Sequence, residues 1–299
     1  MIKGPVIAVV VAYHPKAGEL ETTVKSLLQN FKRVVVVWNG PHPFKVPAFL
    51  KGKRIHLLDM GDNVGLAKAL NEGIGKAFQL GAAWTYLSDQ DSILPGDFKK
   101  LMVEYSGHIP KGLKVATIGP RYFNETTHDK NRFIQMRFLR VNRVGPSIDQ
   151  VYLEAEYLIT SGSFLRRTAF LEVGPMREEL FIDFIDIEWS LRAKRMGYQA
   201  IALPNVTIHH RLGDFGFNFL GMMFPIHSPL RIYYYFRNAA YLYKKRYIDL
   251  NWKAVDGTRN IFRFLFYVVL VKPRLKYMRM ALLGTYHGII GRMGKLKNS

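Results

Sequence analysis

Cysteine is missing from this chain of 299 residues. Its absence excludes disulfide bonds, thiol catalysis and thiolate metal sites, and it fits a cytosolic protein. Long apolar runs are missing too, since no stretch reaches the ~18 uninterrupted apolar residues that a membrane-spanning helix needs. The first apolar run, residues 5–13, has neither the length nor the small-residue cleavage site of a signal peptide, so we expect none.

Negative charge is scarce. The chain has 23 Asp and Glu residues against 43 Lys and Arg residues, which gives a formal net charge of +20. Most of the excess lies in residues 231–299, where 15 basic residues accompany only 2 acidic ones. Such a basic C-terminal region predicts a polyanionic partner, either anionic lipid head groups or a nucleic acid.

The first 97 residues alternate between short apolar runs, of which 5–13 is rich in β-branched residues, and segments with helical periodicity. We expect strands at residues 5–13, 33–38, 55–58 and 84–87, and helices at residues 18–31 and 64–80. This alternation predicts an α/β fold with a doubly wound, mostly parallel sheet. Ligands of such sheets bind beyond the carboxyl ends of the strands, which is where Tyr13, Asn39, Asp62 and Asp89 fall.

The pattern changes after residue 97 and again after residue 230. Over residues 98–230 we expect α+β structure, with strands at 115–118, 133–141, 152–164, 200–203 and 206–210 and a helix at 186–196. Residues 231–299 form a separate helical region, with an apolar stretch at 261–271 that Arg263 interrupts and basic residues follow. Either this stretch lies in a membrane interface or it packs on its own domain.

Two carboxylates, Asp89 and Asp91, follow the expected strand 84–87, with serines at positions 88 and 92 beside them. Carboxylates at positions i and i+2 of a turn suit a hard divalent cation held by oxygen atoms, with open positions for phosphate. A solvated turn without a metal explains the same short pattern.

A second acidic cluster, Asp183, Asp186 and Glu188, surrounds the expected start of helix 186–196. A carboxylate at a helix start is rigid and ionised, which suits a general base. An N-terminal cap with a stabilising Glu in the first turn explains the same residues. Asp183 either assists the base or hydrogen-bonds the backbone.

Two further features leave alternatives open. His210 ends an extended stretch and shares a strand face with Val206 and Ile208, so it either ligates a metal with Asp91 or is structural. Residues 62–65 open a helix whose N-terminus either binds an anion or is simply capped.

Taken in order, these motifs resemble family 2 glycosyltransferases of the GT-A fold over roughly residues 5–240. The resemblance rests on Val-Val-Val-Ala-Tyr-His at 9–14, Val-Trp-Asn-Gly at 37–40, Asn-Val-Gly-Leu-Ala-Lys-Ala-Leu-Asn-Glu-Gly at 63–73, Asp-Gln-Asp at 89–91, Asp-Ile-Glu-Trp-Ser-Leu-Arg at 186–192 and His-Arg-Leu-Gly-Asp at 210–214. The last three, together with Arg-Ile-Tyr-Tyr-Tyr-Phe-Arg-Asn at 231–238, look most like the rhamnosyltransferase branch.

The resemblance implies an inverting transfer from a nucleotide-sugar, dTDP-β-L-rhamnose in this branch. Asp186 would be the base, with Asp183 and Glu188 as possible assisting carboxylates. Asp91 and His210 would hold Mg²⁺ or Mn²⁺, with Asp89 on the ribose or on the metal through water. The implied donor contacts are Ala12, Tyr13, His14, Trp38, Asn39, Asn63, Gly65, Lys68 and Asp89. The implied acceptor contacts are Thr160, Ser161, Gly162 and Trp189, although a plain strand end would explain residues 160–162 equally.

One position departs from the family pattern. The family usually has Asp before Asn in the segment at 37–40, and this chain has Trp38. That Asp commonly contacts the base or ribose, so the departure puts base recognition in doubt. Trp38 either stacks on the pyrimidine or is buried.

The acceptor is inferred from the basic, aromatic region 231–299. Enzymes of this branch often extend lipid-linked glycans, as in O-antigen or cell-wall rhamnan, so we expect a peripheral protein at the cytoplasmic face of the bacterial inner membrane. A homodimer stays open. The rivals are a UDP-hexose donor and a basic nucleic-acid-binding protein, of which no binding module is visible. A nicotinamide-dependent oxidoreductase is disfavoured, because residues 14–18 lack Gly-x-Gly-x-x-Gly.

Overall fold

The computed structural model describes residues 1–16, 18–41, 46–124, 129–130, 132–145, 150–210, 216–219 and 222–296, with the backbone alone at 124, 129–130, 209–210, 216–219 and 222–225. The strands are β1 (Val6–Ala12), β2 (Val34–Trp38), β3 (Ile55–Asp59), β4 (Trp84–Ser88), β5 (Val115–Asn124), β6 (Asp129–Lys130), β7 (Phe133–Arg137), β8 (Arg140–Val144), β9 (Leu153–Ala155), β10 (Phe164–Arg166), β11 (Gln199–His210), β12 (Gly216–Phe219) and β13 (Met222–Pro225). The helices are α1 (Glu19–Asn30), α2 (Leu66–Gln79), α3 (Phe98–Ser106), α4 (Arg167–Val173), α5 (Ile185–Arg195), α6 (Pro229–Tyr243), α7 (Leu250–Val269) and α8 (Arg274–Ile290), with 3₁₀ turns at Ala48–Lys51 and Glu178–Leu180.

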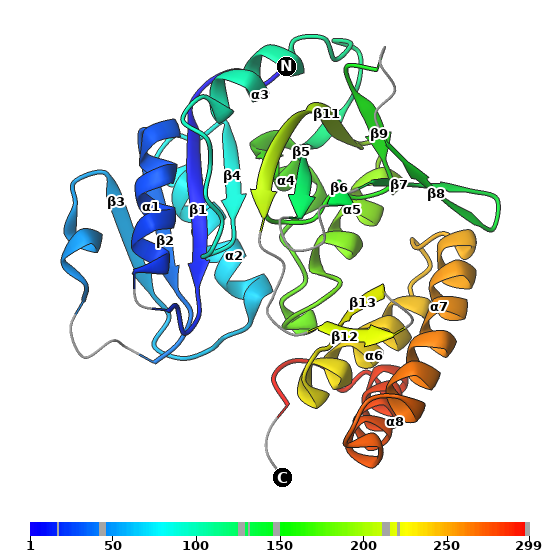
Figure 1. The fold of residues 1–299 in the computed structure, drawn as a ribbon. Coiled ribbons are helices and arrows are strands. Elements are labelled where there is room, and N and C mark those ends of the chain that lie inside the picture. Colours follow the sequence, from blue (N-terminus) through cyan, green and yellow to red (C-terminus); the bar gives the residue numbers. More distant parts are fainter. Residues whose placement is uncertain are drawn as a thin grey trace.

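One sheet, in the order β3-β2-β1-β4-β10-β5-β11-β9, organises the first 210 residues (Figure 1). Strands β1 to β4 pair in parallel. Strand β10 runs antiparallel to both β4 and β5, so β5 and its parallel partner β11 point the same way as β1. The expected mostly parallel sheet is confirmed. The carboxyl ends of β1, β2, β4, β5 and β11 lie along one border of the sheet, which we call the sheet edge.

Helices cover both faces of this sheet. Val6, Ala8 and Val10 of β1 pack with α1 and α3, whereas Ile7 and Val9 pack with α2, α4 and α5. This alternation follows from the two-residue period of a strand, and it buries β1 on both faces. The sheet edge is therefore the part of this layer that offers polar side chains to a ligand.

Helices α6, α7 and α8 lie beyond that edge (Figure 1). Helices α6 and α8 cross closely, because a Cβ added at Gly284 or Gly288 would collide with the backbone of Tyr233 or Arg237. The fully buried guanidinium of Arg237 donates to the Leu180 carbonyl at 2.8 Å. These contacts fasten the C-terminal helices to the segment that precedes α5.

Four strand predictions were wrong in extent, and one of them, 115–118, continues as β5 to Asn124. Residues 133–141 form a hairpin, because Phe138 and Leu139 make an exposed turn between β7 and β8. Residues 152–164 are interrupted by a loop in which Gly162 has a φ of +79°, where an extended strand cannot continue. The segments 200–203 and 206–210 are one strand, β11, with a register shift between them.

Within the described part of the chain, no helix has both the length and the apolarity needed to cross a membrane.

Candidate active site

The turn after β4 presents the Asp89 and Asp91 carboxylates at the sheet edge. Asp89 is exposed and Asp91 is half-buried. Gln90 between them is fastened elsewhere: its side-chain oxygen accepts from the Tyr13 amide at 2.7 Å, and its carbonyl accepts from the Thr23 hydroxyl at 2.8 Å. The turn is thereby held against β1 and α1, which fixes the backbone positions of Asp89 and Asp91.

A tight turn at residues 160–163 connects this first carboxylate pair to the second acidic cluster. The Asp89 amide donates to the Ser161 hydroxyl at 3.1 Å, and the Gly162 amide donates to the Leu87 carbonyl at 2.7 Å. The Thr160 amide donates to the Asp186 carboxylate at 3.2 Å. One turn therefore positions two acidic centres that are almost a hundred residues apart in the sequence.

Asp186 lies at the start of α5, as its sequence pattern predicts. Burial raises the pKa of its carboxyl to about 6, although the Ile187 and Thr160 amides hydrogen-bond the carboxylate and oppose that shift. The Asp183 charge raises this pKa slightly further. A carboxylate with a pKa just below neutrality is ionised at neutral pH and still accepts a proton readily, which suits a general base.

Tyr122 is buried beneath the site and interacts electrostatically with both acidic centres, through Asp89 and Asp186. Burial raises its pKa well above the ordinary range, and the negative charges of Asp89 and Asp186 both add to the shift. A Cβ added at Gly162 would collide with the Tyr122 hydroxyl. Glycine is therefore required at the turn that connects the two acidic centres.

Asp183 pairs with a cation from the C-terminal helices. The Arg231 guanidinium, at the start of α6, donates to the Asp183 carboxylate at 2.9 Å. Burial lowers the pKa of Arg231, but Asp183 outweighs this and Asp89 adds to the rise. A positive charge therefore lies against Asp183 and close enough to Asp89 to interact with it. The sequence reading missed Arg231, although the residue opens the quoted segment 231–238.

The loop before α2 forms a further wall. Asn39, buried at the end of β2, accepts from the Val64 amide at 2.9 Å through its side-chain oxygen. Gly65 has a φ of +89°, and a Cβ there would collide with Phe181. The Leu66 amide donates to the Phe181 carbonyl at 2.6 Å, so this loop is held directly against the segment that carries Asp183.

The other donor candidates lie along the same edge or beside it. Tyr13 and His14 follow β1 directly and are exposed. Ala12 is buried and pairs with Trp38, which is half-buried and donates its indole N–H to the Pro41 carbonyl at 2.8 Å. Lys68 is half-buried in the first turn of α2. The Trp38 ring is therefore neither fully buried nor wholly exposed.

Glu188 is not brought to the site. Its side chain is fully buried and accepts from Arg177, Arg192 and Tyr247 at 2.7 to 3.1 Å. Two helical residues turn by about 200°, so Glu188 and Asp186 leave α5 on opposite sides. Glu188 stabilises the packing of α5, and its predicted role as an assisting carboxylate is wrong.

Three acceptor predictions also need correction. Trp189 is 1 % exposed, packs in the core and donates its indole N–H to the Gly174 carbonyl at 2.8 Å. A side chain so enclosed cannot contact an acceptor. Ser161 and Gly162 are buried in the connecting turn, which leaves Thr160, half-buried, as the candidate from this segment.

The predicted metal ligands are Asp91 and His210, with Asp89 as a possible third, and the structure describes the side chains of Asp89 and Asp91. The His210 side chain and residues 211–214 lie outside what the structure describes, but the backbone of β11 brings His210 to the same edge beside Asn124 of β5. No group of three His, Cys, Asp or Glu side chains suited to a metal occurs among the described residues. Two carboxylates still fit Mg²⁺ or Mn²⁺, because such ions commonly take one or two protein carboxylates, with substrate phosphate and water as the remaining ligands.

Comparison with known proteins decides the family. The family model described as Glycosyl transferase family 2 matches residues 8–174, which is more than half of the chain. The chain belongs to glycosyl transferase family 2. It is also 30% identical over 293 residues to dTDP-rhamnosyl transferase RfbF of Shigella flexneri, with 97% of each chain covered. The protein is therefore a glycosyltransferase.

Solved structures show the same fold at low identity. The chain matches S. aureus TarS 1-349 in complex with UDP-GlcNAc with a TM-score of 0.60 and 12% identity, over 97% of this chain and 82% of that one. It matches GalNAc-T7 with UDP, GalNAc and Mn²⁺ with a TM-score of 0.55 and 15% identity, over 86% of this chain and 54% of that one. This family 2 glycosyltransferase thus has the GT-A fold, and it spans about half the length of the GalNAc-T7 chain.

Proposed function

We propose that this glycosyltransferase moves L-rhamnose from dTDP-β-L-rhamnose to a hydroxyl of a lipid-linked glycan in bacterial cell-surface polysaccharide synthesis. The observation that carries the donor assignment is the similarity to dTDP-rhamnosyl transferase RfbF along nearly the whole of both chains. The arrangement of Asp186, Asp183, Asp89 and Arg231 at one sheet edge supports the chemistry.

Asp186 acts as the general base in this proposal. Its carboxylate takes the proton from the acceptor hydroxyl while that oxygen forms a bond to the anomeric carbon. The bond from the anomeric carbon to the diphosphate oxygen breaks on the opposite side, and the nucleoside diphosphate leaves with the bonding pair. One displacement inverts the anomeric centre, so the β-linked donor gives an α-L-rhamnoside.

Arg231 and the turn after β4 hold the leaving group. Arg231 offers a planar guanidinium that suits the donor diphosphate, and its ion pair with Asp183 keeps it beside the turn that holds Asp89. Asp89 and Asp91 would hold the divalent cation. When bound, that cation would neutralise the negative charge of the diphosphate.

The nucleoside would lie along the ends of β1 and β2. Tyr13 is exposed there, and Trp38 offers part of a ring to a pyrimidine. A UDP-hexose donor is the second candidate, because Trp38 replaces the Asp that would mark a usual base contact, and the fold alone does not distinguish the two bases.

Donor hydrolysis tests the assignment without knowledge of the acceptor. The purified chain is incubated with dTDP-β-L-rhamnose, UDP-glucose or UDP-N-acetylglucosamine, each with Mg²⁺, with Mn²⁺ or with EDTA, and release of the nucleoside diphosphate is measured. We expect slow release from dTDP-β-L-rhamnose that needs a divalent cation. Faster release from either UDP-sugar would overturn the donor assignment, and equal release in EDTA would overturn the metal requirement.

A further inference from the structure

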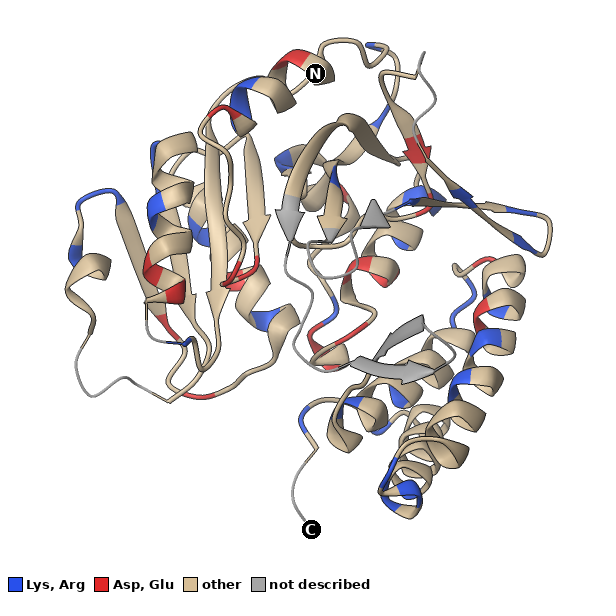
Figure 2. Ribbon diagram, in the orientation of Figure 1, with Lys and Arg blue, Asp and Glu red and all other residues tan. Residues whose placement is uncertain are grey.

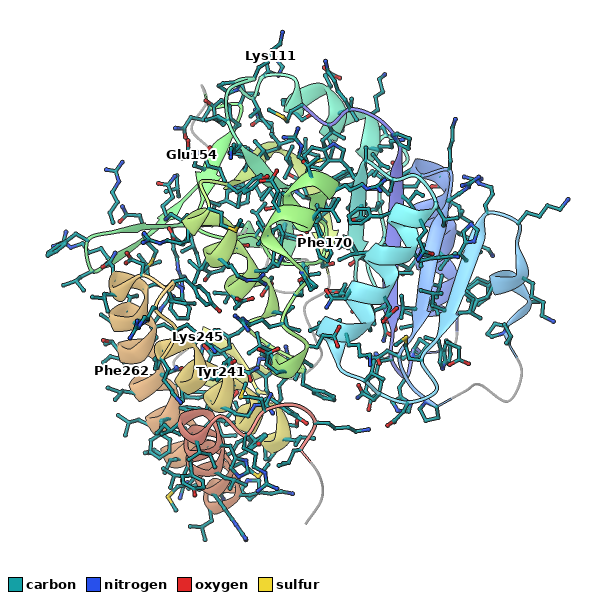
Figure 3. All side chains as sticks on the ribbon, turned by 180° about the vertical axis from the view of Figure 1, so that it is seen from behind. Lys111, Glu154, Phe170, Tyr241, Lys245 and Phe262 are labelled. Atoms are coloured by element: carbon teal, nitrogen blue, oxygen red, sulfur yellow. The ribbon has the colours of Figure 1, made fainter. Side chains whose placement is uncertain are left out.

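Helices α7 and α8 leave large apolar side chains on the surface. On α7 these are Ile261, Phe262, Leu265 and Val269, whose spacing forms one stripe along the helix. Phe262 is 68 % exposed and projects away from the rest of the molecule (Figure 3). On α8 a second stripe is formed by Leu275, Leu282, Tyr286, Ile289 and Ile290. Patches of this kind mark interaction surfaces.

A groove separates the two helices. It has a volume of about 580 Å³, its floor comes from α6 at Phe236, Ala239 and Ala240, and its walls come from α7 and α8. The exposed residues Leu265 and Leu282 belong to its lining. The stripes and the groove together form one apolar face, which we call the α7–α8 face.

The charge around this face has one sign. Residues 250–296 hold nine Lys or Arg residues and a single acidic residue, Asp256. Asp256 is half-buried and accepts from the Tyr243 hydroxyl at 2.7 Å. Figure 2 shows basic residues where α8 begins, and the exposed cations there are Lys272, Arg274, Lys276 and Arg279.

We propose that the α7–α8 face docks on an anionic lipid bilayer, with the apolar stripes in the acyl boundary and the cations on the head groups. Apolar burial and attraction to anionic lipid act together in such surfaces. A second copy of the chain fits less well. A symmetric dimer would place this face against itself, which would bring cations such as Lys272 and Arg274 toward their own copies without a compensating carboxylate.

Helix α6 connects this face to the active site. Arg231, at its start, pairs with Asp183, and Ala239 in the groove floor lies about 12 Å further along the helix axis. Asn238 donates to the Ile182 carbonyl at 2.7 Å and fixes α6 against the site. If the acceptor is lipid-linked, as proposed above, docking would bring its glycan within reach of Asp186. The docking itself does not depend on that proposal.

Vesicle co-sedimentation tests the apolar part. The full chain is mixed with phosphatidylcholine vesicles with and without phosphatidylglycerol. The variant F262S/L265S should bind the anionic vesicles about 100-fold more weakly, at about tenfold for each buried apolar side chain. The matched control is Phe138→Ser, since Phe138 is 87 % exposed in the turn between β7 and β8. This control should bind like the unaltered chain.

The charged part is tested by K276S/R279S against the control K51S/K53S, which removes two exposed lysines near β3. The first variant should lose roughly 30-fold in binding to anionic vesicles, and the control should lose little. Added salt should weaken the binding of the unaltered chain.

Three outcomes would overturn the proposal. The first is equal vesicle binding by F262S/L265S and the Phe138→Ser control, and the second is equal binding to neutral and anionic vesicles. The third is an unaltered chain that does not bind vesicles and is a dimer in sedimentation velocity, with F262S/L265S a monomer. Donor hydrolysis by the same variants keeps this test apart from the proposed function. A variant that releases dTDP normally but leaves the vesicles supports docking, whatever the acceptor.

Discussion

Helices α2 and α7 are both apolar on one side, yet the apolar side is buried in α2 and partly exposed in α7. Helix α2 buries Leu70, Ile74 and Phe78 against the sheet. Helix α7 buries Trp252 and Tyr267 but leaves Ile261 and Phe262 exposed. The apolar side of α2 is buried by the fold, whereas much of the apolar side of α7 is exposed.

The same contrast separates the polar residues of the two regions. Around the sheet edge lie the carboxylates of Asp89, Asp183 and Asp186. The Thr160 amide donates to Asp186, and Arg231 pairs with Asp183. In residues 250–296 cations predominate around apolar surface. One region gathers the charged side chains that the proposed transfer uses, and the other gathers the apolar and basic side chains that the proposed docking uses.

The largest effect should come from the sheet edge. Asp186→Asn should lower transfer by about 10³-fold, because the acceptor proton loses its base, while donor binding stays unchanged. The measurement is turnover beside calorimetric titration of the donor. The exposed Asp97, at the start of α3, provides a control in Asp97→Asn. Retained turnover in Asp186→Asn would remove this residue from the role of base.

Packing between α6 and α8 should give the next largest effect. Gly288→Ala places a Cβ against the Arg237 carbonyl and should destabilise the chain by about 1–3 kcal/mol. Gly75→Ala in α2 meets open space and should stabilise it by up to about 1 kcal/mol. Urea unfolding of both variants measures the difference. Equal changes would show that α8 does not approach α6 closely.

Arg231 should matter for the donor, although it belongs to the C-terminal helices. Arg231→Ala should weaken donor binding by about tenfold or more, since a charge-assisted contact to the diphosphate is lost. Arg231→Lys should recover part of that loss, because the charge returns without the planar fork. Calorimetric titration of the donor checks both variants. Unchanged affinity in Arg231→Ala would exclude a contact with the diphosphate.

The pH dependence should follow from Asp186. Burial raises its carboxyl pKa to about 6, so the base is ionised above that pH and protonated below it. We expect kcat/KM to be level above pH 7 and to fall by about tenfold per pH unit below the pKa. A profile that stays level down to pH 5 would contradict the burial of this carboxylate.

The smallest effect should come from the surface contact between the two regions. Lys295 pairs with Asp62 at 2.7 Å, and both side chains are exposed. Exposed ion pairs contribute little to stability because water and salt screen them. Lys295→Ala should therefore unfold in urea at the same midpoint as the unaltered chain. A clear shift of the urea midpoint would mean that this ion pair stabilises the chain more than an exposed ion pair usually does.

Much of the sheet half follows from local pattern. Strands β1 to β4 end within a residue or two of their predicted limits, because their apolar runs stop at polar turns. That alternation also predicts the sheet edge at which Asn39 follows β2 and Asp89 follows β4. The hairpin at Phe138 was missed, because two exposed apolar residues imitate a continuing strand.

The partners of side chains far apart in the sequence could not be predicted in this way. The pair of Asp183 and Arg231 spans 48 residues, and the buried network around Glu188 reaches Tyr247. Such contacts depend on how the C-terminal region packs against α5 and the segment before it, which no local period encodes. The sequence therefore indicates which side chains could take part in catalysis or binding, and the packing decides which of them reach the site.

A comparison of donor affinities tests the central claim most directly. The affinities of dTDP-β-L-rhamnose, UDP-glucose and UDP-N-acetylglucosamine are measured by calorimetry with Mg²⁺, for the unaltered chain and for Asp91→Ala. We predict that dTDP-β-L-rhamnose binds most tightly, and that Asp91→Ala removes the contribution of the cation. Tighter binding of a UDP-sugar, or a cation effect that survives Asp91→Ala, would contradict the account.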